Sequence, residues 1–395
     1  MRETQKLITA ANSRLSAITA LVTTLALTNL AIAFSIPIFV PQPASSACLE
    51  NTQPENLDLT TSEYTNSPKQ ALPTSPFLQR QRNSQFLYNA NQPPILAESS
   101  QLQSIVNQII KTATAKRLKT QPLSITLIDL NKSQVAGYQQ NQLRYPASVV
   151  KLFWLVALYG QFEQGILTNK AAFQPYMREM IGNSDNDAAS VILDQITATQ
   201  SWSKSQLTKV KFQSWLTRRN QVNCFFEKAG YQGINIDQKT YPVNYLNLSA
   251  PKGTELWMRG NSQAPIRNQI TTQQAARLMY EIVNNQAVSS SASQEMSTLL
   301  TRNLNPQVWR NIYPAFNPVE SFFGESLPSN LKFVSKAGWT SGSRNEVAFI
   351  QTPDGKTRYI LAIFADSSAY AKDNNIFPKM SRLVFDKMTR RSAIR

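Results

Sequence analysis

The sequence predicts an α+β fold in which one antiparallel sheet is built from both ends of a domain, with flanking helices and an inserted helical lobe. Three observations support this prediction. Strand patterns occur near the start of the domain, at residues 124–138, and again near its end, at residues 331–365. Helical patterns fill the interval between them, and amphipathic helices flank the strands at both ends.

The first elements of the domain are a helix and a hairpin. Leu102–Arg117 carries apolar residues at helical spacing, which predicts an amphipathic helix. Ser124–Leu130 and Gln134–Tyr138 are rich in strand-forming residues and flank the polar turn Asn131–Ser133. This arrangement is typical of a β-hairpin.

A buried helix is expected to begin near Ser148. Pro146 sets the start of an apolar run that continues to Ala157, and proline is favoured at the first turn of a helix. Lys151 would then lie one turn after Ser148 on the same helix face, so its amine could act as the base for a serine nucleophile. Unpaired backbone N–H groups at a helix start also favour a developing oxyanion.

The remaining elements alternate between helices and strands. Further helices are expected at Ala171–Ile181, Asp187–Ile196, Thr271–Ile282, Ser291–Leu304 and Asn374–Met388, and strands at Leu331–Ala337, Asn345–Gln351 and Arg358–Ala365. Asp354-Gly355 is typical of the turn between the last two strands.

Composition excludes several kinds of site. The chain has no histidine, so it cannot form a serine-histidine-aspartate triad or an imidazole metal site. Two cysteines, Cys48 and Cys224, cannot form a four-thiolate zinc site. We therefore expect neither metal nor cofactor. Because Cys48 lies in a segment of stalk-like composition, we also expect no structural disulfide.

The N-terminal region predicts a membrane anchor. Residues 19–40 are apolar and uncharged, and basic residues precede them, so residues 1–40 are expected to form a cytoplasmic N-terminus and a transmembrane segment. The catalytic domain would then lie outside the cytoplasm. A cleaved signal peptide is the alternative. Residues 41–99 have the composition of a disordered stalk, which leaves residues 100–395 as the folded domain.

The net charge of +16 raises the possibility of nucleic-acid binding. The basic residues are spread over three distant stretches without a recognised binding module, so we expect a solvated basic surface and no nucleic-acid partner. We expect the protein to be a monomer.

Three motifs occur in a defined order along the domain. They are Ser148-Val149-Val150-Lys151, Ser184-Asp185-Asn186 and Lys336-Ala337-Gly338. S-x-x-K alone is unspecific, since it also occurs at Ser201, Ser249 and Ser329. Together and in this order, on the expected helix, loop and strand, the three motifs resemble the class A β-lactamase-like serine hydrolases and penicillin-binding proteins.

This resemblance implies four catalytic residues in a β-lactamase/transpeptidase-like fold. Ser148 would attack a lactam or peptide carbonyl, and Lys151 would take or relay its proton. Ser184 would carry a proton to the leaving nitrogen, with Lys336 holding this network in a positive field.

It also implies a substrate-binding set. Asn186 would bind an amide of the substrate, and the backbone N–H groups of Ser148 and Trp339 would form the oxyanion hole. Gly338 completes the Lys-x-Gly motif. Because Ala337 replaces the usual Thr or Ser, the missing hydroxyl could come from Thr340 or, as the sequence leaves open, from Ser341, Ser343 or Arg344.

A second departure concerns water activation. Class A enzymes have a glutamate in the loop that here follows Gly230, but the alignment places Thr240 or Tyr241 there, and Asn244 matches plausibly. Glu227 and Glu255 are possible substitutes, although each is expected to be a solvated surface charge.

These features predict a cell-envelope serine hydrolase that forms an acyl-enzyme on Ser148 with β-lactams or peptidoglycan stem peptides, with slow deacylation. The alternative is a non-catalytic cell-wall-binding descendant of the same fold.

Overall fold

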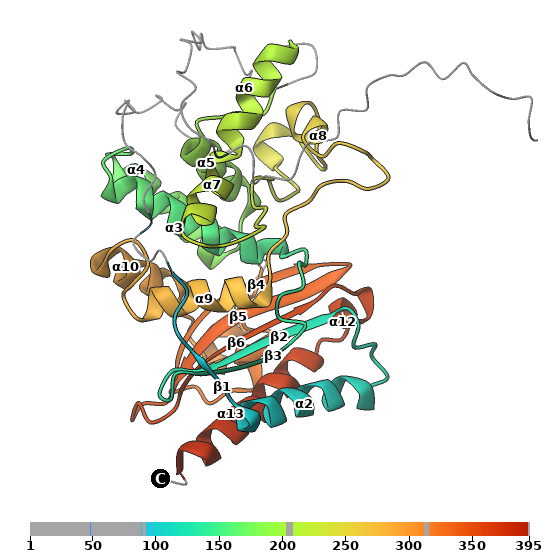
Figure 1. Ribbon diagram of the computed structural model, residues 1–395, viewed down its shortest axis with the longest axis vertical. Coiled ribbons are helices and arrows are strands. Elements are labelled where there is room, and N and C mark those ends of the chain that lie inside the picture. Colours follow the sequence, from blue (N-terminus) through green and yellow to red (C-terminus); the bar gives the residue numbers. More distant parts are fainter. Residues whose placement is uncertain (1–47, 49–87, 89–91, 203–207, 312–315, 394–395) are drawn as a thin grey trace, which may run out of the picture. The chain divides into compact units, whose positions relative to one another are not determined.

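The computed structural model describes residues 48, 88, 92–202, 208–311 and 316–393 (Figure 1). All of them belong to the second of two compact units, Gln42–Arg395. The first unit, Met1–Pro41, lies outside the described residues.

The described residues form a six-stranded sheet with the order β1-β3-β2-β6-β5-β4. Its strands are β1 (Ala97–Glu98), β2 (Leu123–Asp129), β3 (Gln134–Tyr138), β4 (Lys332–Thr340), β5 (Ser343–Gln351) and β6 (Arg358–Ala365). The central pairing of β2 with β6 is antiparallel and joins the two ends of the domain, which confirms the predicted assembly. The expected sheet was fully antiparallel, but β1 pairs parallel with β3 and comes from the predicted stalk.

Helices cover both faces of the sheet (Figure 1). One face carries α2 (Ser100–Ala115), α12 (Ser368–Lys372) and α13 (Ile376–Ala393). The other carries α3 (Val150–Glu163), α9 (Thr272–Val283) and α10 (Ser290–Leu300). Beyond these lies the helical lobe, formed by α4 (Lys170–Gly182), α5 (Asn186–Thr197), α6 (Lys209–Arg219), α7 (Gln221–Lys228) and α8 (Thr254–Trp257). Shorter segments are η2 (Ala147–Val149), η4 (Asn244–Leu246), α11 (Pro306–Trp309) and η5 (Phe323–Ser326).

The two faces have separate apolar cores. The core under α2 and α13 includes Phe333 and Ala337 of β4, whereas Val334 of the same strand belongs to the core under α3 and α9. This alternation follows from the period of two in a β-strand. α3 is buried along nearly its whole length, as its continuous apolar run predicts.

Local capping explains where the helices begin. Ser99 accepts a hydrogen bond from the Leu102 backbone at the start of α2. Thr271 and Gln274 form a capping box at α9, where the sequence predicted a helix start.

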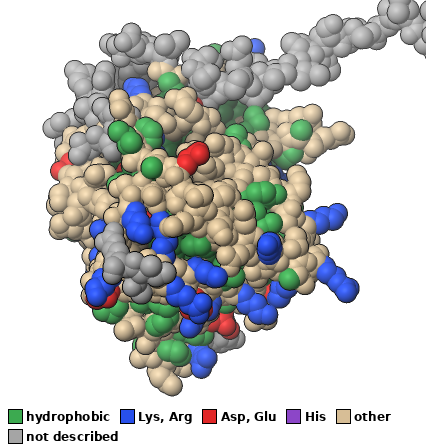
Figure 2. Space-filling view, turned by 60° about the horizontal axis from the view of Figure 1, so that its bottom comes forward, with side chains coloured by type: hydrophobic (Ala, Val, Ile, Leu, Met, Phe, Trp, Pro, Cys, Tyr) green, Lys and Arg blue, Asp and Glu red, His purple; other side chains and the backbone are tan. Residues whose placement is uncertain are grey.

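Basic side chains are numerous on the α2–α13 side of the molecule. Figure 2 brings the α2–α13 side of the molecule forward and shows many Lys and Arg side chains and few Asp and Glu. Exposed cations on this side include Lys111, Arg117, Lys379, Arg382 and Arg390.

The predicted membrane anchoring, with the catalytic domain outside the cytoplasm, is contradicted. No helix among the described residues is long and apolar enough to span a bilayer. The segment on which the prediction depended, residues 19–40, lies outside the described residues.

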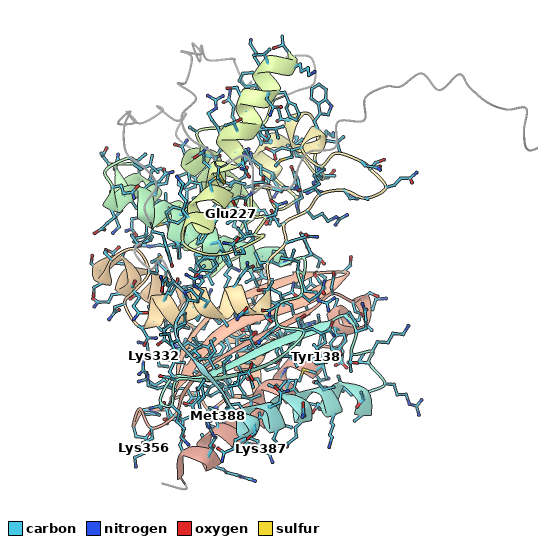
Figure 3. All side chains as sticks on the ribbon, in the orientation of Figure 1. Tyr138, Glu227, Lys332, Lys356, Lys387 and Met388 are labelled. Atoms are coloured by element: carbon cyan, nitrogen blue, oxygen red, sulfur yellow. A yellow bond between two sulfur atoms is a disulfide. The ribbon has the colours of Figure 1, made fainter. Side chains whose placement is uncertain are left out.

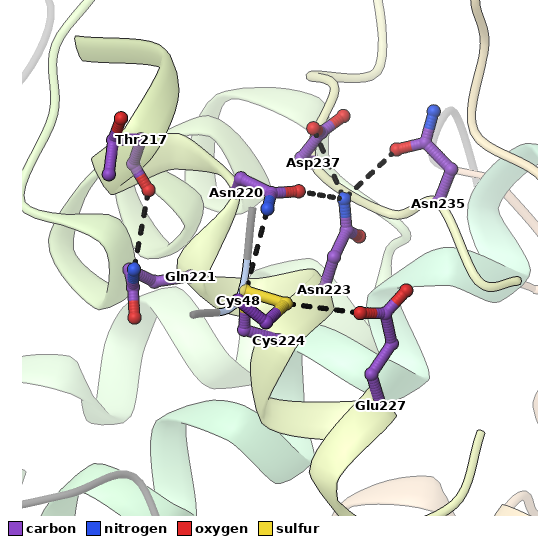
Figure 4. Close-up of a disulfide and its surroundings, with 9 residues drawn as sticks. All are labelled: Cys48, Thr217, Asn220, Gln221, Asn223, Cys224, Glu227, Asn235 and Asp237. Atoms are coloured by element: carbon purple, nitrogen blue, oxygen red, sulfur yellow. Dashed lines mark hydrogen bonds between the residues drawn. A yellow bond between two sulfur atoms is a disulfide. The ribbon is translucent and has the colours of Figure 1, made fainter. Parts of the chain in front are cut away.

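Besides β1 and the Ser99 cap, the predicted stalk contributes Cys48 and Tyr88 to the domain. Cys48 forms a disulfide with Cys224 of α7, which corrects the expectation of unpaired cysteines (Figure 4). Tyr88 is only 5% exposed, and its hydroxyl donates to Glu281 at 2.5 Å. The composition of residues 41–99 could not reveal these contacts, because their partners lie more than 170 residues away along the chain.

Candidate active site

Ser148 lies in η2, the short turn that leads into α3. Ala147 before it adopts a left-handed backbone conformation, with φ of 48°. The Ser148 side chain is half-buried, whereas Lys151 on the first turn of α3 is completely buried. The predicted helix start is therefore confirmed, and the lysine lies inside the protein.

Ser184 occupies a strained turn between α4 and α5. Its φ is 55°, a left-handed conformation that costs energy for a residue with a Cβ. The next residue, Asp185, caps α5 by accepting from the Ala188 backbone at 2.6 Å. This cap fixes the turn, so the carbonyl and the hydroxyl of Ser184 have defined directions.

Ser184 joins the two lysines. Lys151 Nζ donates to the Ser184 carbonyl oxygen and, at 2.8 Å, to Oδ1 of Asn186. Lys336 Nζ donates to the Ser184 hydroxyl at 2.9 Å and to the Ala337 carbonyl at 2.7 Å. The structure thus brings together four of the predicted residues from all three motifs.

Ser148 is connected to this group through the backbone. A Cβ placed on Gly338 of β4 would lie 2.8 Å from the Ser148 nitrogen and 2.8 Å from the Pro146 oxygen. Real Cβ atoms do not approach so closely, so only glycine allows β4 to run against the Ser148 turn. Asn345, the cross-strand partner of Gly338, also donates to the Tyr145 carbonyl at 3.0 Å.

Among the described residues, Lys151 donates to Ser184 and Asn186, and no hydrogen bond joins it to the Ser148 hydroxyl. Catalytic hydrogen bonds are often absent or long without substrate and form in the reacting complex.

Burial changes the charge state of both lysines. It lowers the pKa of Lys151 to about 7, although the negative charge of Asp185 opposes this shift. Burial also lowers the pKa of Lys336 well below its usual range, and the positive charges of Lys151 and Arg302 add to the effect. Near neutral pH, a substantial fraction of Lys151 is therefore an unprotonated amine that can accept a proton.

Two further charged residues near Lys336 were not identified from the sequence. Arg302 is buried and donates to the carbonyls of Ile181 and Ser335, at 2.7 and 3.1 Å. Glu346 is fully buried on β5, and burial raises its pKa to about 8. Neither belongs to a sequence motif, so nothing in the sequence pointed to them.

The residues predicted to bind substrate differ in their exposure and hydrogen-bond partners. Trp339 is 48% exposed, and its indole N–H donates to the Ala371 carbonyl at 2.9 Å. The Thr340 hydroxyl shares a hydrogen bond with the Ser343 hydroxyl at 2.9 Å in the β4–β5 turn. Arg344 donates to the carbonyl of Ala371 beside α12, so its guanidinium is engaged there.

The expected solvated glutamates are not both at the surface. Glu255 is 2% exposed and forms an ion pair with Arg219 at 2.9 Å, so this prediction was wrong. Glu227 is half-buried on α7, within the helical lobe, beside the Cys48–Cys224 disulfide (Figures 3 and 4). The pattern of charged residues alone did not reveal either contact.

Two other carboxylates near the loop after Gly230 are also occupied. Asp237 accepts from the side-chain amide of Asn223 at 3.2 Å, and Asp187 accepts from the Asn244 backbone at 2.5 Å. No group of three or more acidic or cysteine residues in the described ranges could hold a metal ion.

Comparison with known proteins identifies the family. The model of the beta-lactamase enzyme family matches residues 101–388. The chain belongs to this family. The matched residues cover most of the described domain, and the match confirms the β-lactamase-like resemblance drawn from the three motifs.

Two solved structures share the fold. A beta-lactamase from Sphaerobacter thermophilus has a TM-score of 0.50 and 16% identity, covering 72% of this chain and 97% of that one. PBP-A has a TM-score of 0.50 and 15% identity, covering 76% of this chain and all of that one. Golvesin from Dictyostelium discoideum is 27% identical over 191 residues, which make up 47% of this chain and 30% of golvesin. The chain thus spans less than a third of that relative.

Proposed function

We propose that this protein is a serine acyl enzyme in which Ser148 forms an ester with the carbonyl of a β-lactam or a peptidoglycan stem peptide. The observation that carries the proposal is that Ser184 binds both lysines, its carbonyl to Lys151 and its hydroxyl to Lys336. Such an arrangement holds a base for Ser148, the Lys151 amine, and a proton donor for the leaving group, the Ser184 hydroxyl, in one cluster.

In the first step, the neutral amine of Lys151 accepts the Ser148 proton while Oγ attacks the carbonyl carbon. The lowered pKa of Lys151, about 7, supports this role. The negative charge that develops on the carbonyl oxygen is held by the backbone N–H groups of Ser148 and Trp339. The close approach of Gly338 to Ser148 supports a shared oxyanion hole formed by the N–H groups of Ser148 and Trp339.

In the second step, the carbon–nitrogen bond breaks and the leaving nitrogen takes a proton from the Ser184 hydroxyl. Ser184 regains a proton from Lys151, which took it from Ser148 in the first step, and Lys336 holds the Ser184 hydroxyl at 2.9 Å. The side chain of Asn186, already bound to Lys151, is available to orient an amide of the substrate. Thr340 is proposed to supply a hydroxyl near the substrate carboxylate, in place of the one that Ala337 lacks.

We propose that deacylation is slow. Hydrolysis of the ester needs a base that activates water, and the carboxylates around the loop after Gly230 have other partners. Asp237, Asp187 and Glu255 bind Asn223, the Asn244 backbone and Arg219 respectively.

Mass spectrometry of the intact chain after incubation with benzylpenicillin tests the proposal. A mass increase equal to the inhibitor, located on Ser148 and persisting for minutes or longer, is expected. The variant Ser148→Ala should show no adduct. An adduct that disappears within seconds would refute slow deacylation, and a folded protein without any adduct would favour the non-catalytic binding alternative.

A further inference from the structure

Arg302 covers the outer edge of β4, the strand at one end of the sheet. Its backbone N–H donates to the Phe333 carbonyl at 2.9 Å, and its side-chain nitrogen Nη2 donates to the Ser335 carbonyl at 3.1 Å. Alternate residues of an edge strand direct their carbonyls away from the sheet, so this arginine binds two consecutive members of the row. The next member, the Ala337 carbonyl, accepts from Lys336. Arg302 and Lys336 therefore bind neighbouring carbonyls along the same strand edge.

The same nitrogen of Arg302 also binds the helix that leads to Ser184. Nη2 donates to the Ile181 carbonyl at 2.7 Å. Ile181 lies in the last turn of α4, where carbonyls lack a partner within the helix and the helix dipole favours a cation. Burial lowers the pKa of Arg302 to about 10, so the guanidinium still carries its charge at neutral pH. One buried nitrogen atom thus joins the end of α4 to β4.

The bridge made by Arg302 lies beside a hydrogen bond of the proposed catalytic cluster. Lys336 directly follows Ser335 and donates to the hydroxyl of Ser184, which comes three residues after Ile181. The left-handed backbone of Ser184 is strained, and such a conformation persists only where surrounding contacts fix it. Arg302 supplies a contact of this kind, because both carbonyls that it binds belong to the backbone.

We propose that Arg302 is a positioning residue that holds the Ser184 hydroxyl where it can protonate the leaving nitrogen. Its hydrogen bonds go to backbone carbonyls and not to a reacting atom, so it acts through the distance between the segments that carry Ser184 and Lys336. Without the bridge these segments can separate, and a displacement of an ångström is enough to slow a reaction by about 100-fold. This inference rests on the proposed function.

The test compares two probes whose leaving groups differ in their need for a proton. The nitrogen of benzylpenicillin leaves as an amine, which requires the proton that Ser184 donates. In the thioester of phenylacetylglycine with mercaptoacetate, attack by Ser148 breaks the carbon–sulfur bond, and sulfur leaves as a thiolate with the bonding electrons and without a proton. The measured quantity is the ratio of the penicillin to the thioester acylation rate on the full chain, followed by mass spectrometry with Ser148→Ala as the background.

Arg302→Met should lower this ratio by about tenfold or more, because it weakens the step that only the penicillin needs. A loss of folded protein would reduce both rates alike and leave the ratio unchanged. Arg302→Lys keeps several N–H donors on one nitrogen and should restore most of the ratio. Arg302→Gln is shorter and uncharged but still polar, so it tests the bridge if Arg302→Met does not fold, and its ratio should lie between those of the other two variants.

Two further variants make the result specific. Arg277→Met removes another buried arginine that donates to two backbone carbonyls, those of Ala229 and Gly230 at 2.6 and 3.2 Å, and should reduce stability without changing the ratio. Ser184→Ala removes the proton donor itself and should lower the ratio. Adding Arg302→Met to Ser184→Ala should lower it little further, because two residues that act through one step have non-additive effects.

The outcomes separate the two proposals. If Ser184→Ala lowers the ratio but the folded Arg302 variants keep the wild-type value, or if the two losses multiply in the double variant, Arg302 is not a positioning residue and the proposed function stands. If the thioester does not react with the wild type, the same double-variant comparison is made with the penicillin rates alone. If neither probe acylates the folded wild-type chain, the proposed function fails, and the role of Arg302 with it.

Discussion

Two buried charge clusters in this protein contrast with each other. The site cluster consists of Lys151, Lys336, Arg302 and Glu346, and the lobe cluster of Arg219, Lys239, Asp194 and Glu255. In the lobe cluster, each cation is in contact with a carboxylate at 2.9 Å or less. In the site cluster, the two lysines bind serine, asparagine and carbonyl oxygens instead.

The different partners have opposite effects on pKa values. Burial alone would lower the pKa of Arg219, but Glu255 and Asp194 together raise it, so it stays charged. Burial lowers the pKa of Lys151 to about 7. A buried cation thus stays charged where carboxylates compensate it, whereas a buried lysine held by neutral polar groups has a lowered pKa and is a candidate base.

The largest effect should come from removing the reactive amine. Lys151→Met should reduce the rate of Ser148 acylation by about 10²- to 10⁴-fold, the usual contribution of a general base. Stopped-flow or mass-spectrometric acylation kinetics measure this loss. The matched control is Lys379→Met on the exposed surface of α13, which should acylate at the wild-type rate. Equal rates for both variants would remove Lys151 from the mechanism.

The same variant should also change how protein stability depends on pH. The pKa of Lys151 is lower in the folded state than the unfolded value of about 10.4, so wild-type stability rises with pH between about 7 and 10. Lys151→Met lacks this pH-dependent contribution to stability. Its melting temperature should therefore exceed that of the wild type most at pH 6 and least at pH 10.

The lobe cluster should respond in the opposite way. Arg219→Met leaves the buried Glu255 and Asp194 without one of their cations, and breaking such a pair costs about 3–5 kcal/mol. Urea denaturation measures the loss of unfolding free energy. The pH profile of acylation in the fraction that stays folded should not move. A stability unchanged within error would show that the two clusters do not differ as described.

A smaller effect is expected from Gly338→Ala, which disturbs geometry rather than charge. The new Cβ would lie 2.8–2.9 Å from backbone atoms of Pro146, Ser148 and Val149, none of which can rotate away. Acylation should fall by about 10- to 100-fold, because displacing a reacting group by an ångström has effects of this order. Gly182→Ala in α4, where a Cβ meets nothing within 4 Å, is the control and should keep the wild-type rate.

The pH dependence of the wild type tests the same base without any substitution. Below the pKa of Lys151, about 7, the amine is protonated and cannot accept the Ser148 proton. The acylation rate should therefore rise about tenfold per pH unit up to about pH 7 and then level off. A rate that does not change between pH 5 and 8 would exclude Lys151 as the titrating base.

The sequence determined the features that depend on neighbouring residues. The apolar run after Pro146, the hairpin with Asp354-Gly355 and the Thr271 cap each specify a helix or turn locally, and the structure confirms them. The three motifs in order were sufficient to indicate the family, because a shared fold places the same residues in the same elements. The sequence also excluded a histidine-based site, since the chain has no histidine.

The tertiary structure alone decided the features that depend on distance. Lys336 reaches Ser184 from 152 residues away, and Cys48 meets Cys224 from 176 residues away. The burial of Glu255 was likewise invisible in the sequence. Whether a charged side chain is solvated or paired depends on which distant segments pack around it, and no local pattern contains that information. For the same reason, the sequence could propose Lys151 as a base, but only its surroundings in the fold lower its pKa toward neutrality.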